Sequence, residues 1–259
     1  MNNTVVAVGG IITMGFLAAV FSYYQFNPQH KKRKKSSMNQ SELRNVLKKL
    51  SSMVAFKENE SLGYSYIVPF AISQVHLDNE SDILALALVT LSNALSFPRN
   101  VHLISTPSNL ARFTHLCDAP FVDDNVHSAA IRVFINLSLH TDAHTDIIPY
   151  MKQLQRIPPP NYSSVLQVCV NLCCNSSTSS VLVHELNFKI LLRRCVECDD
   201  DILLKTCYLF KNMSYNISQE EKNIIVQHFQ LFLPIFNAKL ANCDESLSEQ
   251  LNLTIQCLK

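Results

Sequence analysis

Cysteine is the residue whose spacing in this chain comes nearest to that of a reactive or metal site. Cys195 and Cys198 are separated by two residues, as in zinc sites and redox-active dithiols. A closed zinc site needs four ligands. The sequence offers no second matched pair, since the adjacent Cys173 and Cys174 cannot readily share one tetrahedral site with the first. A helical context without a βαβ pattern disfavours redox use. We expect reduced, buried thiols, no metal and no cofactor.

Other catalytic chemistry finds little support in the sequence. His140 and His144 have the spacing of some metal ligands, but they flank a predicted loop at residues 141–143, and we expect both on the solvated surface. No Ser or Cys nucleophile motif occurs. After residue 26 the chain holds one glycine, too few for a phosphate-binding loop. We expect a protein that is not an enzyme. The open alternative is cysteine chemistry at Cys195 and Cys198, which needs an exposed site with a lowered thiol pKa.

A second group of candidate residues consists of asparagines that recur in apolar stretches. Four stand at intervals of 43, 35 and 41 residues: Asn93, Asn136, Asn171 and Asn212. A weaker fifth copy holds Asn252. The residues three and two places before each of the four, and one place after, are mostly apolar, so the amide lies off the apolar stripe of a helix and faces outward. An amide carries a donor and an acceptor and can bind a peptide unit. Alternatively, each amide binds neighbouring backbone or water.

Helices must position these residues, because the chain after residue 26 has too little glycine for many tight β-turns. Residues 41–56 are predicted to form an amphipathic helix, with an apolar face of Leu43, Val46, Leu47, Leu50, Met53 and Val54. The asparagines lie in further apolar helices. Residues 146–157, 187–196 and 229–240 are predicted as companion helices between them. Acidic or capping residues precede the asparagine-containing helices, where they satisfy free N–H groups.

The period, the shared register and the companion helices together resemble the armadillo repeat, a unit of about 40 residues in three helices whose third ends in Asn-Leu. The resemblance covers residues 55–259 and implies an all-α, right-handed α-solenoid of about five repeats. In armadillo proteins the third helices line a concave groove, and their asparagines bind the backbone of an extended peptide. The resemblance therefore implies that Asn93, Asn136, Asn171 and Asn212 bind a partner.

One departure from the armadillo pattern concerns the position four residues before each asparagine. Importins that read nuclear-import cargo carry tryptophan there. This chain has no tryptophan, and the four positions hold Val89, Arg132, Gln167 and Tyr208. We therefore do not expect a reader of nuclear-import cargo.

The N-terminus has the composition of a membrane anchor. Residues 4–26 carry no charge over 23 residues, and about 20 suffice to span a bilayer as a helix. Tyr23 and Tyr24 stand near its end, where aromatic rings favour the headgroup zone. A basic block follows, made of Lys31, Lys32, Arg33, Lys34 and Lys35. The positive-inside rule then places everything after the span in the cytosol. A cleaved signal peptide and a buried core helix are the alternatives.

The chain is thus divided into a transmembrane signal anchor at 1–27, a basic linker at 28–40 and an armadillo-like domain at 41–259. This architecture resembles the mitochondrial armadillo proteins, the Alex group and its autosomal relative. The resemblance implies the outer mitochondrial membrane, and a part in organelle distribution, dynamics or motor-adaptor coupling through cytosolic proteins or extended peptides. The alternatives are an endoplasmic reticulum anchor, or a soluble nuclear or signalling adaptor whose basic block is an import signal.

Net charge argues against nucleic acid as a partner. The whole chain carries +1 and the basic block +5, so residues 36–259 carry −4. Nucleic-acid binding needs basic patches against phosphates, and this domain is acidic. Ten Asn-x-Ser/Thr sequons occur, but a cytosolic domain would leave them unglycosylated.

Overall fold

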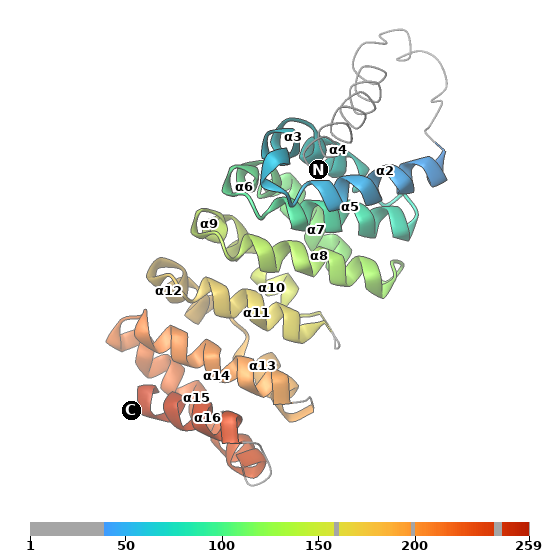
Figure 1. Cartoon of the computed structure of the whole chain (residues 1–259). Helices are drawn as coiled ribbons and strands as arrows, with labels where there is room; N and C mark the ends of the chain where they lie inside the picture. Colours follow the sequence, from blue (N-terminus) through green and yellow to red (C-terminus); the bar gives the residue numbers. More distant parts are fainter. Residues whose placement is uncertain (1–38, 158–160, 198–199, 241–244, 259) are drawn as a thin grey trace, which may run out of the picture. The chain divides into compact units, whose positions relative to one another are not determined.

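The structure is a computed structural model that describes residues 39–157, 161–197, 200–240 and 245–258 (Figure 1). The chain divides into two units, residues 1–40 and 41–259, and the helices described below belong to the second. Every regular element within the described ranges is helical, which confirms the all-α class. The predicted anchor and the basic block, including Tyr23, Tyr24 and Lys31 to Lys35, lie outside the described residues. No helix in the described part is long and apolar enough to cross a membrane.

Six helices recur at similar intervals along the unit, and we call them the ladder helices. They are α2 (Gln40–Met53), α5 (Ser81–Ala94), α8 (Asp124–Leu137), α11 (Tyr162–Leu172), α14 (Asp200–Tyr215) and α16 (Glu245–Leu258). In chain order, α5 packs against α8, α8 against α11, α11 against α14, and α14 against α16. Figure 1 shows this succession running from blue to red. The side chain of Asn93 in α5 also bonds Ser51 in α2, so the six ladder helices follow one another in one row.

The remaining helices lie between the ladder helices in sequence. They are α3 (Glu60–Leu62), α4 (Val68–Gln74), α6 (Val101–Ile104), α7 (Pro107–Asp118), α9 (His144–Ile147), α10 (Met151–Leu154), α12 (Ser176–Glu185), α13 (Phe188–Glu197) and α15 (Gln219–Leu240). Single helical turns join them: η2 (Lys57–Asn59), η3 (Gly63–Ile67), η4 (Pro98–Asn100), η5 (Thr141–Ala143) and η6 (Ile148–Tyr150). Of these, α7 packs on both α8 and α10, and α13 on both α14 and α15. The row is therefore backed by a second layer.

The core follows the register predicted around the asparagines. The residues two places before them are all buried: Leu91, Phe134, Cys169 and Phe210. The residues three places before and one place after are buried as well. The predicted amphipathic helix is α2, which buries Val46, Leu47 and Leu50. These apolar positions hold the helices together because the free energy of burial grows with the apolar area removed from water.

Proline divides one of the predicted companion helices. The apolar pattern predicts one helix over residues 146–157, but the structure has three short pieces there: α9, η6 and α10. Pro149 stands in the first positions of η6, where its missing N–H leaves no intrahelical bond unmade. The other two predicted companions are α13 and the second half of α15. The latter contains Pro234 within the helix.

The C-terminal end of each of four ladder helices is closed by a side chain six residues further on, and we call these side chains the cap residues. The hydrogen bonds run from Asn59 to Met53 O, from Asn100 to Ala94 O, from His144 to Ser138 O and from Thr178 to Leu172 O. A helix end leaves carbonyls without intrahelical partners, so a side chain folded back from the next turn satisfies one of them. The prediction that His144 is solvated is therefore wrong: it is 2% exposed and part of the core.

Candidate partner-binding face

The four predicted asparagines lie on successive ladder helices, and each donates back to the helix before it. Asn93 Nδ2 donates to the carbonyl and the hydroxyl of Ser51, both at 3.1 Å. Asn136 Nδ2 does the same to Ser92, at 2.9 Å to each oxygen. Both amides are half-buried. Each asparagine therefore joins two neighbouring helices instead of standing free in solvent.

The next two asparagines continue this pattern with different partners. Asn171 Nδ2 donates to Ser138 Oγ at 2.9 Å, and its Oδ1 accepts from Gln167 Nε2 at 2.9 Å. Asn212 Nδ2 lies 3.4 Å from Val170 O. The four together form what we call the asparagine ladder: Asn93, Asn136, Asn171 and Asn212. Sequence reasoning missed its acceptors, although a serine directly before Asn93 and two residues after Asn136 gave a weak signal.

The weaker fifth copy does not extend the asparagine ladder. Asn252 in α16 is exposed. The neighbouring Thr254 is buried instead, and its hydroxyl donates to Cys207 O at 3.3 Å and to Gln250 O at 2.8 Å. A threonine two residues beyond the expected position thus bonds α16 to α14. Thr254 was not among the predicted site residues.

Some side-chain oxygens of the asparagine ladder are left as hydrogen-bond acceptors for a partner. Among the residues that the structure describes, nothing donates to Oδ1 of Asn93, Asn136 or Asn212, whereas Gln167 occupies that of Asn171. An amide oxygen can accept the N–H of a peptide backbone. The arrangement can therefore bind donors of an extended chain, and each of the four amide nitrogens already donates within the protein.

Side chains beside the asparagine ladder give this face a mixed chemistry. Arg132 is exposed and lies four residues before Asn136, one turn away on the same helix. Three residues after the asparagines, Leu139 is 66% exposed and Tyr215 is 65% exposed. Exposed apolar side chains of this size, next to cations and amide oxygens, suit contact with another protein more than contact with bulk water.

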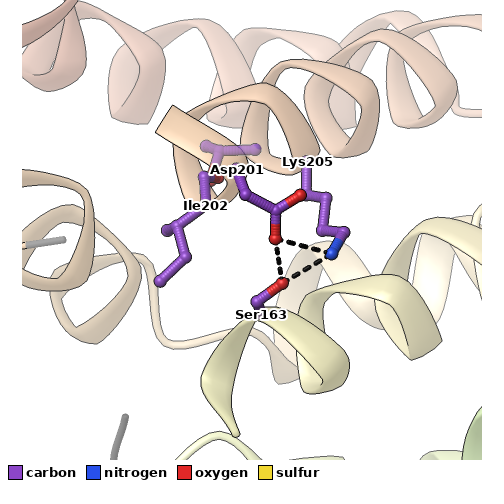
Figure 2. A network of polar contacts seen from close by, with 5 residues as sticks. Ser163, Asp201, Ile202 and Lys205 are labelled. Carbon is purple, nitrogen blue, oxygen red and sulfur yellow. Dashed lines mark hydrogen bonds and ion pairs between the residues drawn. The ribbon is translucent and has the colours of Figure 1, made fainter. Parts of the chain in front are cut away.

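A polar network ties the N-terminal ends of two ladder helices together (Figure 2). Asp201 in α14 accepts from Ser163 in α11 and, at 2.8 Å, from Lys205 one turn along α14. Burial disfavours the charged form of Asp201, but the hydrogen bonds from Lys205 and Ser163 outweigh it and lower the pKa of the carboxyl. Figure 2 shows the three polar ends converging between the helices. The network therefore holds α11 and α14 in register.

Comparable ties occur between other ladder helices. Arg44 in α2 contacts both Glu80 and Asp82 at the start of α5. Ser128 in α8 donates to Asn161, which precedes α11, at 3.1 Å. Three pairs of ladder helices, α2–α5, α8–α11 and α11–α14, are thus bonded near their N-terminal ends by these groups, in addition to the asparagine ladder near their C-terminal ends.

The cysteine pair considered for chemistry is only partly described. Cys195 is buried, with its sulfur 3.3 Å from the hydroxyl of Thr206, whereas Cys198 lies outside the described residues. Cysteine catalysis requires an exposed thiol, and the thiol of Cys195 is buried. Elsewhere in the core, burial raises the pKa of the Cys169 and Cys207 thiols to about 12. No cluster of three or more His, Cys, Asp or Glu residues placed to hold a metal occurs in the described part of the chain.

Comparison with known proteins shows the fold but no family. No protein-family model matches the sequence, and no curated protein matches it. Three crystal structures of engineered proteins from the Northeast Structural Genomics Consortium resemble the structure. Their TM-scores are 0.69, 0.71 and 0.68, each at 12% sequence identity and covering 86% of this chain. The match spans 92%, 95% and 56% of those chains, respectively. The all-helical arrangement is therefore one that occurs in solved structures.

Proposed function

We propose that this chain is a membrane-anchored interaction scaffold that recruits cytosolic proteins through the face formed by its ladder helices. In this proposal the unit is a right-handed α-solenoid of armadillo-like repeats, and the face is its groove. The observation that carries the proposal is the asparagine ladder. Four asparagines at one register bond successive helices together, and three of them offer oxygens to an incoming chain. A partner peptide lying across the row would donate its backbone N–H groups to those oxygens.

The cellular part of the proposal rests on the sequence. The uncharged span at 4–26 and the basic block after it favour an anchor with the domain in the cytosol. The resemblance to the mitochondrial armadillo proteins favours the outer mitochondrial membrane and a function in mitochondrial distribution or dynamics, including motor-adaptor coupling. The second candidate is a soluble nuclear or signalling adaptor, which the five cations at 31–35 would suit as an import signal.

Alkaline carbonate extraction of the tagged full chain separates the two candidates. We expect the full chain to stay with the membrane pellet and a variant lacking residues 1–35 to be soluble. Microscopy of the same two forms should then show mitochondria labelled only by the full chain. Release of the full chain into the soluble fraction would exclude the anchor and leave the nuclear adaptor.

The role of the face is tested by proximity labelling from the full chain in cells. The test variant combines Arg132→Ala with Lys211→Ala, where Lys211 directly precedes Asn212 in α14. It removes two cations near asparagines of the ladder and keeps the asparagines themselves. The control combines Lys57→Ala with Lys222→Ala, which removes the same charge away from the ladder helices. We expect the first variant to lose cytosolic partners that the control retains. Equal partner recovery from the two variants would refute binding through this face.

A further inference from the structure

A cleft lies away from the asparagine ladder, where α10, α12, α13 and α15 meet. Its volume is about 650 Å³. The loop that joins α12 to α13 contributes Leu186 and Asn187 to its lining. The cleft is of a size that accommodates several side chains of a bound peptide, and none of its lining residues is an asparagine of the ladder.

The cleft is held open by hydrogen bonds to a buried glutamine. Gln155 is 3% exposed; its Nε2 donates to Glu185 O at 3.2 Å, and its Oε1 accepts from Asn187 N at 2.6 Å. Asn187 Oδ1 in turn accepts from Ile190 N and begins α13. Both ends of the connecting loop are thus fixed to the protein interior, so a ligand would meet a surface that is already formed.

The lining carries a local excess of positive charge. Glu185 is the one carboxylate among the lining residues, and it is paired with Lys152 at 2.8 Å. Arg156 and Lys189 are exposed and have no carboxylate or hydrogen-bond acceptor among the residues that the structure describes. Residues 36–259 carry −4 overall, so these two cations stand out from an acidic domain. Two unpaired cations at the edge of a cleft attract a negatively charged ligand.

The floor between these cations is apolar. Leu186, Ile190 and Ile224 are partly exposed in the cleft, where the side chain of a ligand can cover them. At one end, the ring of His228 stacks on Phe188, with 4.4 Å between ring centroids and 16° between planes. The floor can therefore bury an apolar side chain, as the anchoring pockets of protein interfaces do.

We propose that this cleft binds an acidic segment of a partner protein, in which an apolar side chain is flanked by carboxylates. The apolar side chain covers the floor, and the carboxylates pair with Arg156 and Lys189. This site is separate from the proposed groove and does not depend on it, because its residues lie on α10, α12, α13 and α15 and on the segments that follow α10 and α12, and not on the ladder helices. The chain would then hold two segments of one partner, or two partners, at once.

Fluorescence anisotropy with the purified full chain in nonionic detergent tests this proposal. The probe is a fluorescein-labelled peptide in which leucines are flanked by glutamates, and the reference peptide has glutamines in their place. We expect the acidic peptide to bind at least about tenfold more tightly than the reference, with the preference falling as salt is raised. Equal affinity of the two peptides would overturn the proposal.

Matched variants locate the binding site. Arg156→Ala with Lys189→Ala should weaken binding of the acidic peptide about tenfold, since two charge pairs are lost. Lys57→Ala with Lys222→Ala removes the same charge from residues outside both the cleft lining and the asparagine ladder, and should leave the affinity unchanged. Replacing both cleft cations by glutamate should reverse the preference, so that a lysine-flanked peptide binds better. An equal loss in both alanine pairs, or no reversal, would overturn the assignment to this cleft. Circular dichroism confirms that each variant is folded.

Discussion

An asparagine that bonds two helices together contributes to the stability of the fold, whether or not a ligand is bound. Asn136 places its amide hydrogens between the carbonyl and the hydroxyl of Ser92, at a half-buried position. A typical hydrogen bond of this kind contributes about 1 kcal/mol, and an acceptor left unpaired in the protein costs more. The amides of the asparagine ladder therefore stabilise the row directly, and the oxygens of Asn93, Asn136 and Asn212 are available to a partner.

Replacing Asn136 by alanine should lower stability by about 1–2 kcal/mol, because the carbonyl of Ser92 loses a donor at a helix–helix contact. Thermal unfolding followed by circular dichroism measures the change. Asn252→Ala is the matched control: the same substitution on α16, at an exposed residue outside the asparagine ladder, should leave the melting temperature unchanged. Equal melting temperatures for the two variants would contradict a structural role for Asn136.

Thiol labelling should separate the cysteines by burial. Cys174 is exposed, whereas burial raises the pKa of Cys169 and Cys207 to about 12 and keeps both as unreactive thiols in the folded chain. We expect iodoacetamide at neutral pH to modify Cys174 before Cys169 and Cys207, and to reach those two only after denaturant is added. Peptide mass spectrometry gives the order. Early modification of Cys169 in the folded chain would contradict its position in the core.

At the scale of single elements, the cap residues bond the C-terminal ends of four ladder helices, α2, α5, α8 and α11. Asn100 and His144 cap the successive ladder helices α5 and α8, and each donates to a carbonyl six residues earlier. The two side chains have different sizes and chemistries, but both present an N–H donor. The position therefore requires a side-chain donor that can reach the carbonyl six residues earlier, and more than one residue type can provide it.

This equivalence predicts that His144→Asn retains more stability than His144→Ala. Alanine leaves the Ser138 carbonyl without its partner and opens space at a residue that is 2% exposed, which should cost about 2–4 kcal/mol. Asparagine supplies a donor and should recover part of that loss. Chemical denaturation of the three forms measures it, with His102→Ala as an exposed control on α6. Equal losses in the asparagine and alanine variants would contradict a capping role.

The tie between α11 and α14 should weaken in acid. The pKa of Asp201 is lowered from its ordinary value of 3.8, so the carboxylate stabilises the folded state above that pH. The contribution is lost as the pH falls through the lowered pKa, where the folded carboxyl also takes up a proton. The difference in melting temperature between the native chain and Asp201→Asn should be constant near neutral pH and shrink below about pH 4. A difference that grows in acid would contradict the sign of the shift.

At the scale of the whole unit, stability should depend on position in the row. From α5 onward each ladder helix packs on the next, so α8 has neighbours on both sides, in α5 and α11, whereas α16 lies at the end of the row and packs against α14. In such quasi-one-dimensional packing, the ends open more easily than the middle. We expect the amides of α8 to exchange with deuterium more slowly than those of α16. Uniform protection along the row would indicate instead one cooperative unit.

Much of the fold could be predicted from the sequence, because helical periodicity and scarce glycine are local properties. Most positions around Asn93, Asn136, Asn171 and Asn212 were expected in the core from their apolar character, and all of them, including the polar Thr90, are buried. The expected core role of residues 41–56 was also confirmed, in α2. The division at Pro149 was missed because the apolar pattern continues across it, although proline forbids the bond that a continuous helix needs.

The sequence by itself determined the helical class, the period of the repeating helices and the apolar stripe of each, since these depend on residues a few positions apart. Only the tertiary structure decided what each polar group contacts. The partners of the asparagine ladder stand 33 to 44 residues away, the burial of His144 depends on the helix end it caps, and the cleft around Gln155 needs α10, α12, α13 and α15 together. Such contacts depend on which helices become neighbours, and spacing along the chain does not specify that.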